Sequence, residues 1–284
     1  MILVDMNQVS LSSLMIQIGT SKDKEVSIDL VRHIILNSLR SYRSKFSEEN
    51  GELVLCYDSR NYWRKKFFPQ YKQHRKKSRE SSGFDWNSIF NALNQIKEEL
   101  IENFPYKVLE VTGAEADDII ATLCEKFNDS ENIMIVSGDK DFIQLQKYEK
   151  VKQWSPSTKK FLNGIDPALY LKEHILKGDR GDGIPNVLSK DDTFENGFRQ
   201  KPLTKKKLQT WLEHDFLDVA PNEEVKRNYQ RNQTLVDFSK IPVTIKEDIM
   251  NKWNNTTPKG DRTNLINYFI NNKLKELVDN LGDF

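Results

Sequence analysis

Acidic residues follow three of the short apolar runs in this sequence. Asp5 ends the run ILVD near the start of the chain, and Asp58 ends the run LVLCYD. A third run, IMIV, leads through a Ser-Gly pair into Asp139 and Asp141. Two carboxylates this close repel each other unless a cation neutralises them. The end of the third run therefore indicates a divalent metal site.

A further group of acids opens the segment GAEADDIIATLCEKF. The periodicity places Glu115, Asp117 and Asp118 in the first turn of a helix. Acids are common there because they complement the helix dipole, but three in four residues exceed that need. Glu115 and Asp118 share a helix face. The spacing leaves open which of Asp117 and Asp118 faces a metal.

Two more aspartates, Asp179 and Asp182, stand in the turn GDRGDGIP, where glycine lets the backbone approach a metal or a phosphate closely. No histidine or cysteine joins these acids at a regular spacing. Oxygen ligands alone favour Mg²⁺ or Mn²⁺ over zinc. Because Mg²⁺ keeps several of its waters, so many acids indicate two ions. Two ions beside a basic segment indicate phosphodiester hydrolysis.

That basic segment is RNYWRKKFFPQYKQHRKKSR, which contains no acid. Its cationic residues are Arg60, Arg64, Lys65, Lys66, Lys72, Arg75, Lys76, Lys77 and Arg79, and its interleaved aromatic residues are Tyr62, Trp63, Phe67, Phe68 and Tyr71. Cations with exposed rings are typical of a surface that binds a nucleic-acid backbone and stacks on bases. Pro69 interrupts any single helix, so we expect two short helices or a partly disordered arm.

Unbroken apolar runs predict the strands that position these residues, and apolar residues at helical spacing predict the helices. Strands are expected at residues 2–6, 52–58, 106–111 and 133–136, with helices at 26–46, at 86–103 behind a capping Asp85, and within 113–127. This alternation predicts an α/β domain with a mostly parallel sheet. The acids then stand at the carboxyl ends of the strands, where such sheets bind ligands.

The rest of the chain has a different texture. A short helix at 142–147 precedes a hairpin of residues 151–154 and 160–162. Helical patterns follow at 170–177, 203–212, 222–234, 246–253 and 263–281, separated by polar stretches such as 191–202. We therefore expect a mostly helical second half.

Composition sets the broad class. The chain has 284 residues, 37% of them hydrophobic and 30% charged, and a net charge of +1. This length fits one large α/β domain with an appendage, or two domains. Near-neutral net charge does not exclude nucleic acid, because the cations are clustered. Cys56 and Cys124 lie in apolar stretches and are expected to be reduced core residues, as in a cytoplasmic protein. Neither a membrane span nor a signal peptide is expected.

The motifs occur in a fixed order: a strand ending in an acid, LCYD, the basic segment, EADD, SGDKD and GDRGDGIP. This set resembles the 5′-nuclease family, which includes flap endonucleases, and within it most the ribonuclease H of T-even phages. The resemblance implies a mostly parallel sheet flanked by helices in a catalytic domain of residues 1–165, with a basic helical arch at 60–82. It also implies an α-helical, DNA-binding region at 166–284. There GDRGDGIP opens a helix-turn-helix-like element, although the glycine hairpin common in the family is missing.

The resemblance also implies roles for particular residues. One metal ion would be held by Asp5, Asp58, Glu115 and Asp117 or Asp118, and a second by Asp141, Asp179 and Asp182, with Asp139 near both. Lys72 and Arg75 match arch residues that contact the scissile phosphate and act with Asp139 in catalysis. The expected nucleic-acid contacts are Arg60, Arg64, Lys65, Lys66, Lys72, Arg75, Lys76, Lys205, Lys206 and Lys207.

The implied activity is Mg²⁺-dependent hydrolysis by two ions, with Mn²⁺ as a substitute. It would act from the 5′ end of RNA–DNA and DNA–DNA duplexes, as a 5′→3′ exonuclease and flap endonuclease that removes RNA primers from lagging-strand fragments. The implied partners are duplex, hybrid and 5′-flap nucleic acid, a phage single-stranded-DNA-binding protein and a sliding clamp, for a monomer in the host cytoplasm. The alternatives are a non-catalytic structure-specific DNA-binding protein and a PIN-like ribonuclease. A haloacid-dehalogenase-like phosphatase requires an aspartate at the position of Asn7.

Overall fold

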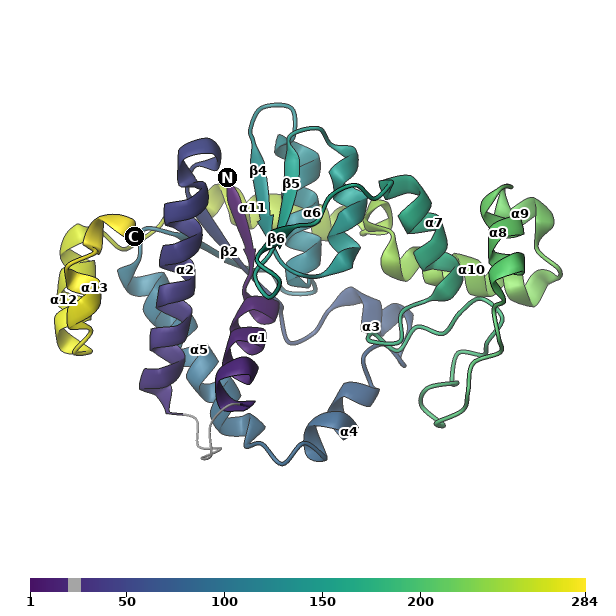
Figure 1. The fold of residues 1–284 in the computed structure, drawn as a ribbon, viewed down its shortest axis with the longest axis horizontal. Coiled ribbons are helices and arrows are strands. Elements are labelled where there is room, and N and C mark those ends of the chain that lie inside the picture. Colours follow the sequence, from purple (N-terminus) through teal and green to yellow (C-terminus); the bar gives the residue numbers. More distant parts are fainter. Residues whose placement is uncertain (20–26) are drawn as a thin grey trace. The chain divides into compact units, whose positions relative to one another are not determined.

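The computed structural model describes residues 1–19 and 27–284, so the predicted helix start at Val26 lies outside the described residues. The chain forms two compact units, each built from segments that are distant in the sequence (Figure 1). Unit 1 contains Met1–Arg60, Phe84–Asn163 and Lys246–Phe284, and unit 2 contains Asn61–Gly83 and Gly164–Ile245. The expected domains, 1–165 and 166–284, divide the chain differently and stay a prediction.

Unit 1 contains a six-stranded sheet in the order β3-β2-β1-β4-β5-β6. The strands are β1 (Ile2–Asp5), β2 (Leu53–Tyr57), β3 (Lys107–Glu110), β4 (Ile133–Val136), β5 (Val151–Ser155) and β6 (Lys160–Phe161). All neighbours are parallel except β5 and β6, which form the predicted hairpin. The mostly parallel sheet is therefore confirmed.

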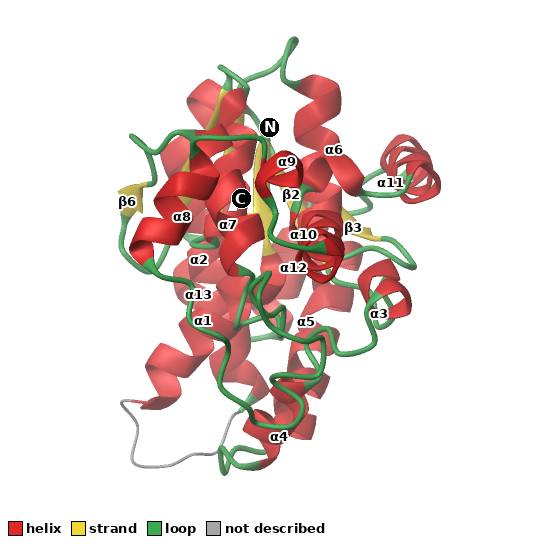
Figure 2. Ribbon diagram, turned by 90° about the vertical axis from the view of Figure 1, so that its right-hand side faces the viewer, coloured by secondary structure: helices red, strands yellow, loops and turns green. Residues whose placement is uncertain are grey.

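The central strands β1, β2 and β4 are buried on both faces, which explains why they are continuous apolar runs. Ile2 and Val4 of β1 contribute to a core that also contains residues of α1 (Met6–Gly19), α2 (Ile28–Asn50) and α5 (Trp86–Asn103). Leu3 points to the opposite face and is equally buried. On that face α6 (Ala116–Phe127) contacts β1 and β2. The strands, yellow in Figure 2, thus lie between layers of helices.

Local signals explain where the helices begin. Asp85 caps α5 as expected, because its carboxylate accepts hydrogen bonds from the backbone N–H groups of Asn87 and Ser88. The predicted short helix after β4 is a 3₁₀ helix, η1 (Lys140–Lys147). No helix among the described residues is both long and apolar enough to cross a membrane.

The carboxyl-terminal helices return to unit 1. The helix α11 (Val243–Asn255) is followed by α12 (Arg262–Asn271), α13 (Lys275–Val278) and a 3₁₀ turn, η3 (Leu281–Asp283). One helical segment was expected at 263–281, and this prediction is wrong because the structure has two separate helices there. The chain breaks between α12 and α13, where Lys273 has a positive φ of 58°.

Unit 2 is helical. It contains α3 (Trp63–Phe67), α4 (His74–Glu80), α7 (Pro167–Lys177), α8 (Lys205–Leu212), α9 (Phe216–Val219), α10 (Glu223–Val236) and a short 3₁₀ turn, η2 (Phe238–Lys240). The two short helices expected around Pro69 are confirmed as α3 and α4. The described residues between α7 and α8 form turns without a helix, so the helix-turn-helix-like element stays a prediction.

Candidate metal centre

Three acids stand at the carboxyl edge of the sheet in unit 1. Asp5 is the last residue of β1, Asp58 directly follows β2, and Asp139 follows β4 after two residues. These strands are neighbours and run in parallel, so their carboxyl ends lie at one edge. The predicted gathering of these three acids therefore follows from the sheet order.

Asp5 is the most buried of the three, with 4% of its surface exposed. Its Oδ1 accepts a hydrogen bond from the backbone N–H of Gln8 at 3.0 Å, and its Oδ2 accepts one from the Ser137 hydroxyl at 3.0 Å. The pKa of Asp5 is raised to about 7, chiefly by burial and also by the carboxylates of Asp58 and Asp139, while the two hydrogen bonds limit the rise. A divalent cation would relieve this repulsion, which is the condition of a metal site.

Asp58 and the start of α6 are joined. The Oδ1 of Asp58 accepts a hydrogen bond from the backbone N–H of Ala116 at 2.7 Å. Glu115 and Asp118, both fully buried, form a capping box in which each side chain accepts a hydrogen bond from the other residue's backbone N–H. Asp117 is partly exposed and lies close enough to act electrostatically on Cys56, as Asp5 does. The structure thus gives Glu115 and Asp118 a capping role at the start of α6, and the metal-binding roles of Glu115, Asp117 and Asp118 stay predictions.

The turn after β4 is held by side chains from other elements. The backbone N–H of Asp139 donates to the Ser137 hydroxyl, and the Asp139 carboxylate accepts from the backbone N–H of Asp141 at 3.0 Å. Gly138 donates its N–H to Gln8 at 3.1 Å, and a Cβ at Gly138 would lie 2.9 Å from the Gln8 amide nitrogen. A side chain at position 138 would therefore displace Gln8 from the turn that carries Asp139 and Asp141.

The second pair of acids belongs to a turn in unit 2. Gly178 opens it with a φ of +66°, and a Cβ at this position would lie 2.4 Å from the carbonyl oxygen of Ile184. Within the turn, Asp179 accepts a hydrogen bond from the backbone N–H of Asp182 at 3.0 Å. His174 places its Nε2 3.4 Å from the Asp179 carboxylate. Burial acts to raise the pKa of Asp179, but His174 and nearby backbone N–H groups outweigh it, so this pKa lies below its ordinary value.

The structure places one histidine, His174, beside these acids. It lies near the end of α7 and is buried beside Asp179. Four residues lie between His174 and Asp179, and they contain the end of α7 and Gly178. This spacing matches no regular metal-ligand motif. A histidine in the last turn of a helix is an ordinary dipole partner, so the sequence contained no signal that singled it out.

Asp182 is surrounded by groups from the basic segment, all within unit 2. Its carboxylate accepts hydrogen bonds from the Tyr71 hydroxyl at 2.7 Å and from an Arg75 nitrogen at 2.5 Å. The Lys72 ammonium lies 3.6 Å from the same carboxylate, and the Lys72 backbone N–H donates to the Asp182 carbonyl oxygen at 2.8 Å. Lys72 has a positive φ of 56°, a backbone conformation that is unfavourable for lysine. Its two contacts with Asp182 stabilise this conformation. The residues expected at the phosphate are thus positioned by a predicted metal ligand.

The basic segment is less exposed than expected. Phe67 is exposed, as expected of this segment, but Phe68 and Tyr71 are buried in a cluster with Ile175 and Ile184. Arg64 is 2% exposed, and its Nε donates to the Leu235 carbonyl oxygen at 2.8 Å. The structure therefore gives Arg64 a packing role, contrary to the expected nucleic-acid contact.

The remaining cations of the predicted nucleic-acid set are mostly on the surface. Arg60, Lys65, Lys66, Arg75, Lys76, Lys205, Lys206 and Lys207 are exposed, and Lys72 is partly buried. Lys205–Lys207 form the first turn of α8, behind the N-cap Thr204. Cations in a first turn are unfavourable for the helix dipole, so packing within α8 does not explain their presence.

Comparison with known proteins assigns the family. The profile of the 5′-3′ exonuclease N-terminal resolvase-like domain matches residues 2–173, and that of the T4 RNase H C-terminal region matches residues 166–284. The chain belongs to the 5′-nuclease family. It is 34% identical to the ribonuclease H of Enterobacteria phage T4, over 99% of this chain and 95% of that protein. The predicted family, its phage ribonuclease H branch and the predicted class of enzyme are confirmed.

Other 5′-nucleases match less of the chain or match in fold. A flap endonuclease Xni of Shewanella pealeana is 37% identical over 44% of this chain and 48% of its own length. The bacteriophage T5 flap endonuclease, solved in a pseudo-enzyme-product complex with DNA and metal ions, superposes with a TM-score of 0.65 at 16% identity. That alignment covers 88% of this chain and 98% of the T5 protein. The likeness confirms the fold.

Proposed function

We propose that this 5′-nuclease cleaves phosphodiester bonds from the 5′ end of duplex nucleic acid, as an exonuclease and flap endonuclease that depends on Mg²⁺. The observation that carries the proposal is the buried Asp5, whose pKa is raised by burial and by the carboxylates of Asp58 and Asp139. A protein gains nothing in stability by burying an acid against two others. Such an arrangement is expected where a hard cation binds during function.

The acids divide into two ligand groups, one in each unit. In unit 1 the carboxylates of Asp5, Asp58, Glu115 and Asp117 or Asp118 are proposed to hold the first ion, with Asp139 and Asp141 in the turn after β4. In unit 2, Asp179 and Asp182 are proposed to contribute to the second ion. All of these donors are hard oxygens, which fit Mg²⁺ and also Mn²⁺. Two such ions, when bound, supply an activated water and charge stabilisation at the leaving oxygen.

The chain's own cations complete the proposed site. Lys72 and Arg75 are held on Asp182 in this structure, so their positive charges are oriented before a substrate arrives. A phosphate that enters would compete for these cations and receive preorganised positive charge as negative charge develops in the transition state. Tyr71 keeps a hydroxyl on Asp182 and fixes the orientation of that carboxylate. Both cations are thus proposed as catalytic, together with Asp139.

The substrate and setting follow from the family. The T5 relative was solved with DNA, and the T4 relative is named a ribonuclease H. We therefore propose RNA–DNA and DNA–DNA duplexes with 5′ ends or 5′ flaps as substrates, and removal of RNA primers from lagging-strand fragments as the role. The proposed setting is the cytoplasm of a host cell, with a single-stranded-DNA-binding protein and a sliding clamp as partners of a monomer.

Cleavage assays on variants of the two ligand groups test this function. End-labelled nicked, 5′-flapped and RNA-primed duplexes are incubated with and without Mg²⁺. Asp139→Asn and Asp182→Asn are each expected to reduce Mg²⁺-dependent cleavage about 100-fold or more, because loss of a metal's outer partners alone costs about 10- to 100-fold. Asp248→Asn, an exposed change on α11, is the matched control and is expected to cleave like the wild type.

Three results would contradict the proposal. Near-wild-type cleavage by both Asp139→Asn and Asp182→Asn would show that these acids do not hold the ions. Tight binding of flapped DNA without any Mg²⁺-dependent turnover would instead support a non-catalytic DNA-binding protein. Faster cleavage of single-stranded RNA than of flapped duplexes would support a PIN-like ribonuclease.

A further inference from the structure

A pocket of about 550 Å³ lies in unit 2, and none of the residues that line it is a proposed metal ligand. It is lined by His74 of α4, by Arg180 of the 178–185 turn, and by Phe194, Phe198, Arg199 and Gln200 of the loop before α8. This size lies in the range that encloses one small ligand and is too small for a duplex. The pocket could therefore take one unit of a polymer or one small molecule.

The charge of the pocket selects an anion. Arg180 and Arg199 are both exposed, and within the described chain neither guanidinium forms an ion pair with an acid. The residues that line the pocket include no aspartate or glutamate. Guanidinium groups bind phosphate through paired hydrogen bonds. Two of them at one pocket, without an internal counter-charge, indicate a phosphate-bearing ligand.

An exposed ring accompanies the two arginines. Phe198 has 64% of its surface exposed. A single exposed apolar residue is by itself ordinary and indicates no ligand. Here, however, the ring lines the same pocket as the two guanidinium groups. A stacking surface beside phosphate-binding groups is the combination that proteins use for unpaired nucleotides.

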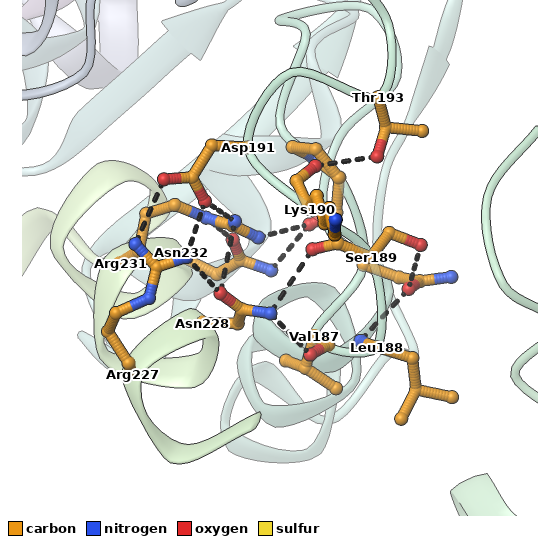
Figure 3. A network of polar contacts seen from close by, with 12 residues as sticks. Val187, Leu188, Ser189, Lys190, Asp191, Thr193, Arg227, Asn228, Arg231 and Asn232 are labelled. Carbon is orange, nitrogen blue, oxygen red and sulfur yellow. Dashed lines mark hydrogen bonds and ion pairs between the residues drawn. The ribbon is translucent and has the colours of Figure 1, made fainter. Parts of the chain in front are cut away.

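The loop that carries the ring is anchored at its start. Asp191 binds both nitrogens of the Arg227 guanidinium, at 2.8 and 2.9 Å, and forms an ion pair with Arg231, as Figure 3 shows. Asn228 donates to the backbone carbonyl oxygens of residues 187 and 189, at 3.0 and 3.1 Å. These three residues of α10 hold the loop without using the pocket arginines.

The end of the loop is tied back to its beginning. The Gln200 side chain accepts a hydrogen bond from the Asn186 backbone N–H at 2.6 Å, and the Asn186 side chain donates to the Lys201 carbonyl oxygen at 2.9 Å. The Lys201 N–H donates to the Ser189 hydroxyl at 2.9 Å. Phe198 itself donates its backbone N–H to the carbonyl oxygen of residue 193. The ring is therefore presented by a closed loop, which lowers the entropic cost of binding.

We infer that this pocket binds one unpaired nucleotide of the nucleic-acid substrate, whose base stacks on Phe198 and whose phosphates pair with Arg180 and Arg199. The inference rests on the proposed function, which makes nucleic acid the ligand, but it concerns affinity and substrate shape and involves no chemical step. It predicts that the protein distinguishes a tailed duplex from a blunt one through residues that are not metal ligands.

Binding without cleavage tests this pocket. Fluorescence anisotropy is measured in EDTA, over a series of salt concentrations, for a blunt duplex and for the same duplex with a single-stranded tail. Phe198→Ala is expected to weaken binding of the tailed duplex about 5- to 100-fold, because stacking contributes about 1–3 kcal/mol per base. The salt dependence should stay unchanged. Arg199→Gln is expected to weaken binding and to reduce the salt slope by about 1, the mark of a lost phosphate contact.

Matched variants control for general effects. Phe161→Ala removes another exposed ring, and Arg262→Gln removes another exposed arginine, both in unit 1. Both are expected to bind the tailed duplex like the wild type. Phe198→Trp should restore the affinity that Phe198→Ala loses, because a larger ring also stacks. Equal losses on blunt and tailed duplexes, or no loss with Phe198→Ala, would overturn the inference.

The binding and cleavage experiments distinguish an error in the pocket assignment from an error in the nuclease assignment. If the wild type cleaves flapped DNA with Mg²⁺ but Phe198→Ala binds it normally, only the pocket assignment is wrong. If Phe198→Ala loses affinity for tailed DNA while no Mg²⁺-dependent cleavage occurs, the pocket stands and the nuclease assignment is wrong.

Discussion

At the scale of single residues, Asp5 concentrates the electrostatic cost of the proposed metal centre. It is buried, and its two carboxylate neighbours raise its pKa beyond the effect of burial. The hydrogen bonds from Gln8 and Ser137 orient the carboxylate but do not cancel the repulsion. A residue with this balance is stable when protonated or when bound to a cation, and unstable as an isolated anion.

The raised pKa of Asp5 makes the stability of the folded protein depend on pH. The folded pKa of Asp5, about 7, exceeds its ordinary value of 3.8, so between these values the folded state holds more protons than the unfolded state. Asp5 should therefore not reduce the free energy of unfolding of the metal-free protein below pH 4. That free energy should decline as the pH rises through 7. Thermal melting in EDTA between pH 5 and 8 should show this decline. Asp5→Asn should flatten it, and saturating Mg²⁺ should offset it.

The matched control for this experiment is Asp248→Asn, which removes an exposed acid from α11. It should retain the wild-type decline in melting temperature. If Asp5→Asn and the wild type decline equally in EDTA, the burial of Asp5 is not costly and the argument for a cation at this edge loses its basis.

At the scale of elements, the turn of residues 178–185 positions the second group of acids through its first residue. Gly178 combines a positive φ with the close approach of the Ile184 carbonyl oxygen, whereas Gly164 has a similar φ of +75° and no neighbour within 4 Å. Gly164→Ala should therefore cost only the conformational term, about 1–3 kcal/mol. Gly178→Ala should cost clearly more and displace Asp179 and Asp182. Urea unfolding measures both free energies, and cleavage by Gly178→Ala should fall while Gly164→Ala stays active.

Equal unfolding free energies for the two alanine variants would contradict this account. They would show that the turn relaxes around a Cβ at position 178 without cost. The same pair of variants therefore tests whether the geometry of the turn, and not glycine flexibility alone, sets the positions of Asp179 and Asp182.

Most elements could be predicted because their signals are local. Continuous apolar runs identified β1, β2 and β4, and the acids that follow them were identified with the strands. Pro69 predicted the division into α3 and α4. The break between α12 and α13 was missed because it contains neither proline nor glycine, only a lysine with positive φ.

The parts of the site that sequence could not give depend on tertiary contacts. The hydrogen bond that joins the Asp58 carboxylate to the start of α6 spans 58 positions in the sequence. The burial of Arg64 and the pairing of Asp182 with the basic segment depend on residues more than 100 positions away. Composition and spacing identify the residue types of a site, but they do not show which cation is packed and which is exposed.

At the scale of the whole molecule, the carboxyl-terminal helices belong to the core of unit 1. Phe104, at the end of α5, has three aromatic neighbours from this region: Tyr268, Phe269 and Phe284, with ring centroids 5.4, 6.1 and 5.8 Å away. The Tyr268 hydroxyl also donates to the Glu99 carboxylate at 2.6 Å. The sheet that carries Asp5, Asp58 and Asp139 is thus stabilised by residues more than 100 positions later in the chain.

A fragment of residues 1–165, the expected catalytic domain, should therefore not fold stably alone. It lacks five buried side chains of the unit 1 core: Leu265, Tyr268, Phe269, Leu277 and Phe284. At about 1.5–3 kcal/mol each, their burial contributes on the order of 10 kcal/mol, which is comparable with the whole stability of a typical domain. Circular dichroism and thermal melting should show a fragment without a cooperative transition, and addition of a peptide of residues 246–284 should restore part of it. Phe269→Ala in the full chain is expected to lower the free energy of unfolding by about 3–5 kcal/mol, which measures the effect of losing one of these side chains. Cooperative melting of the fragment near the temperature of the full chain would instead show that these helices are an appendage, because the sheet would then hold its acids in place without them.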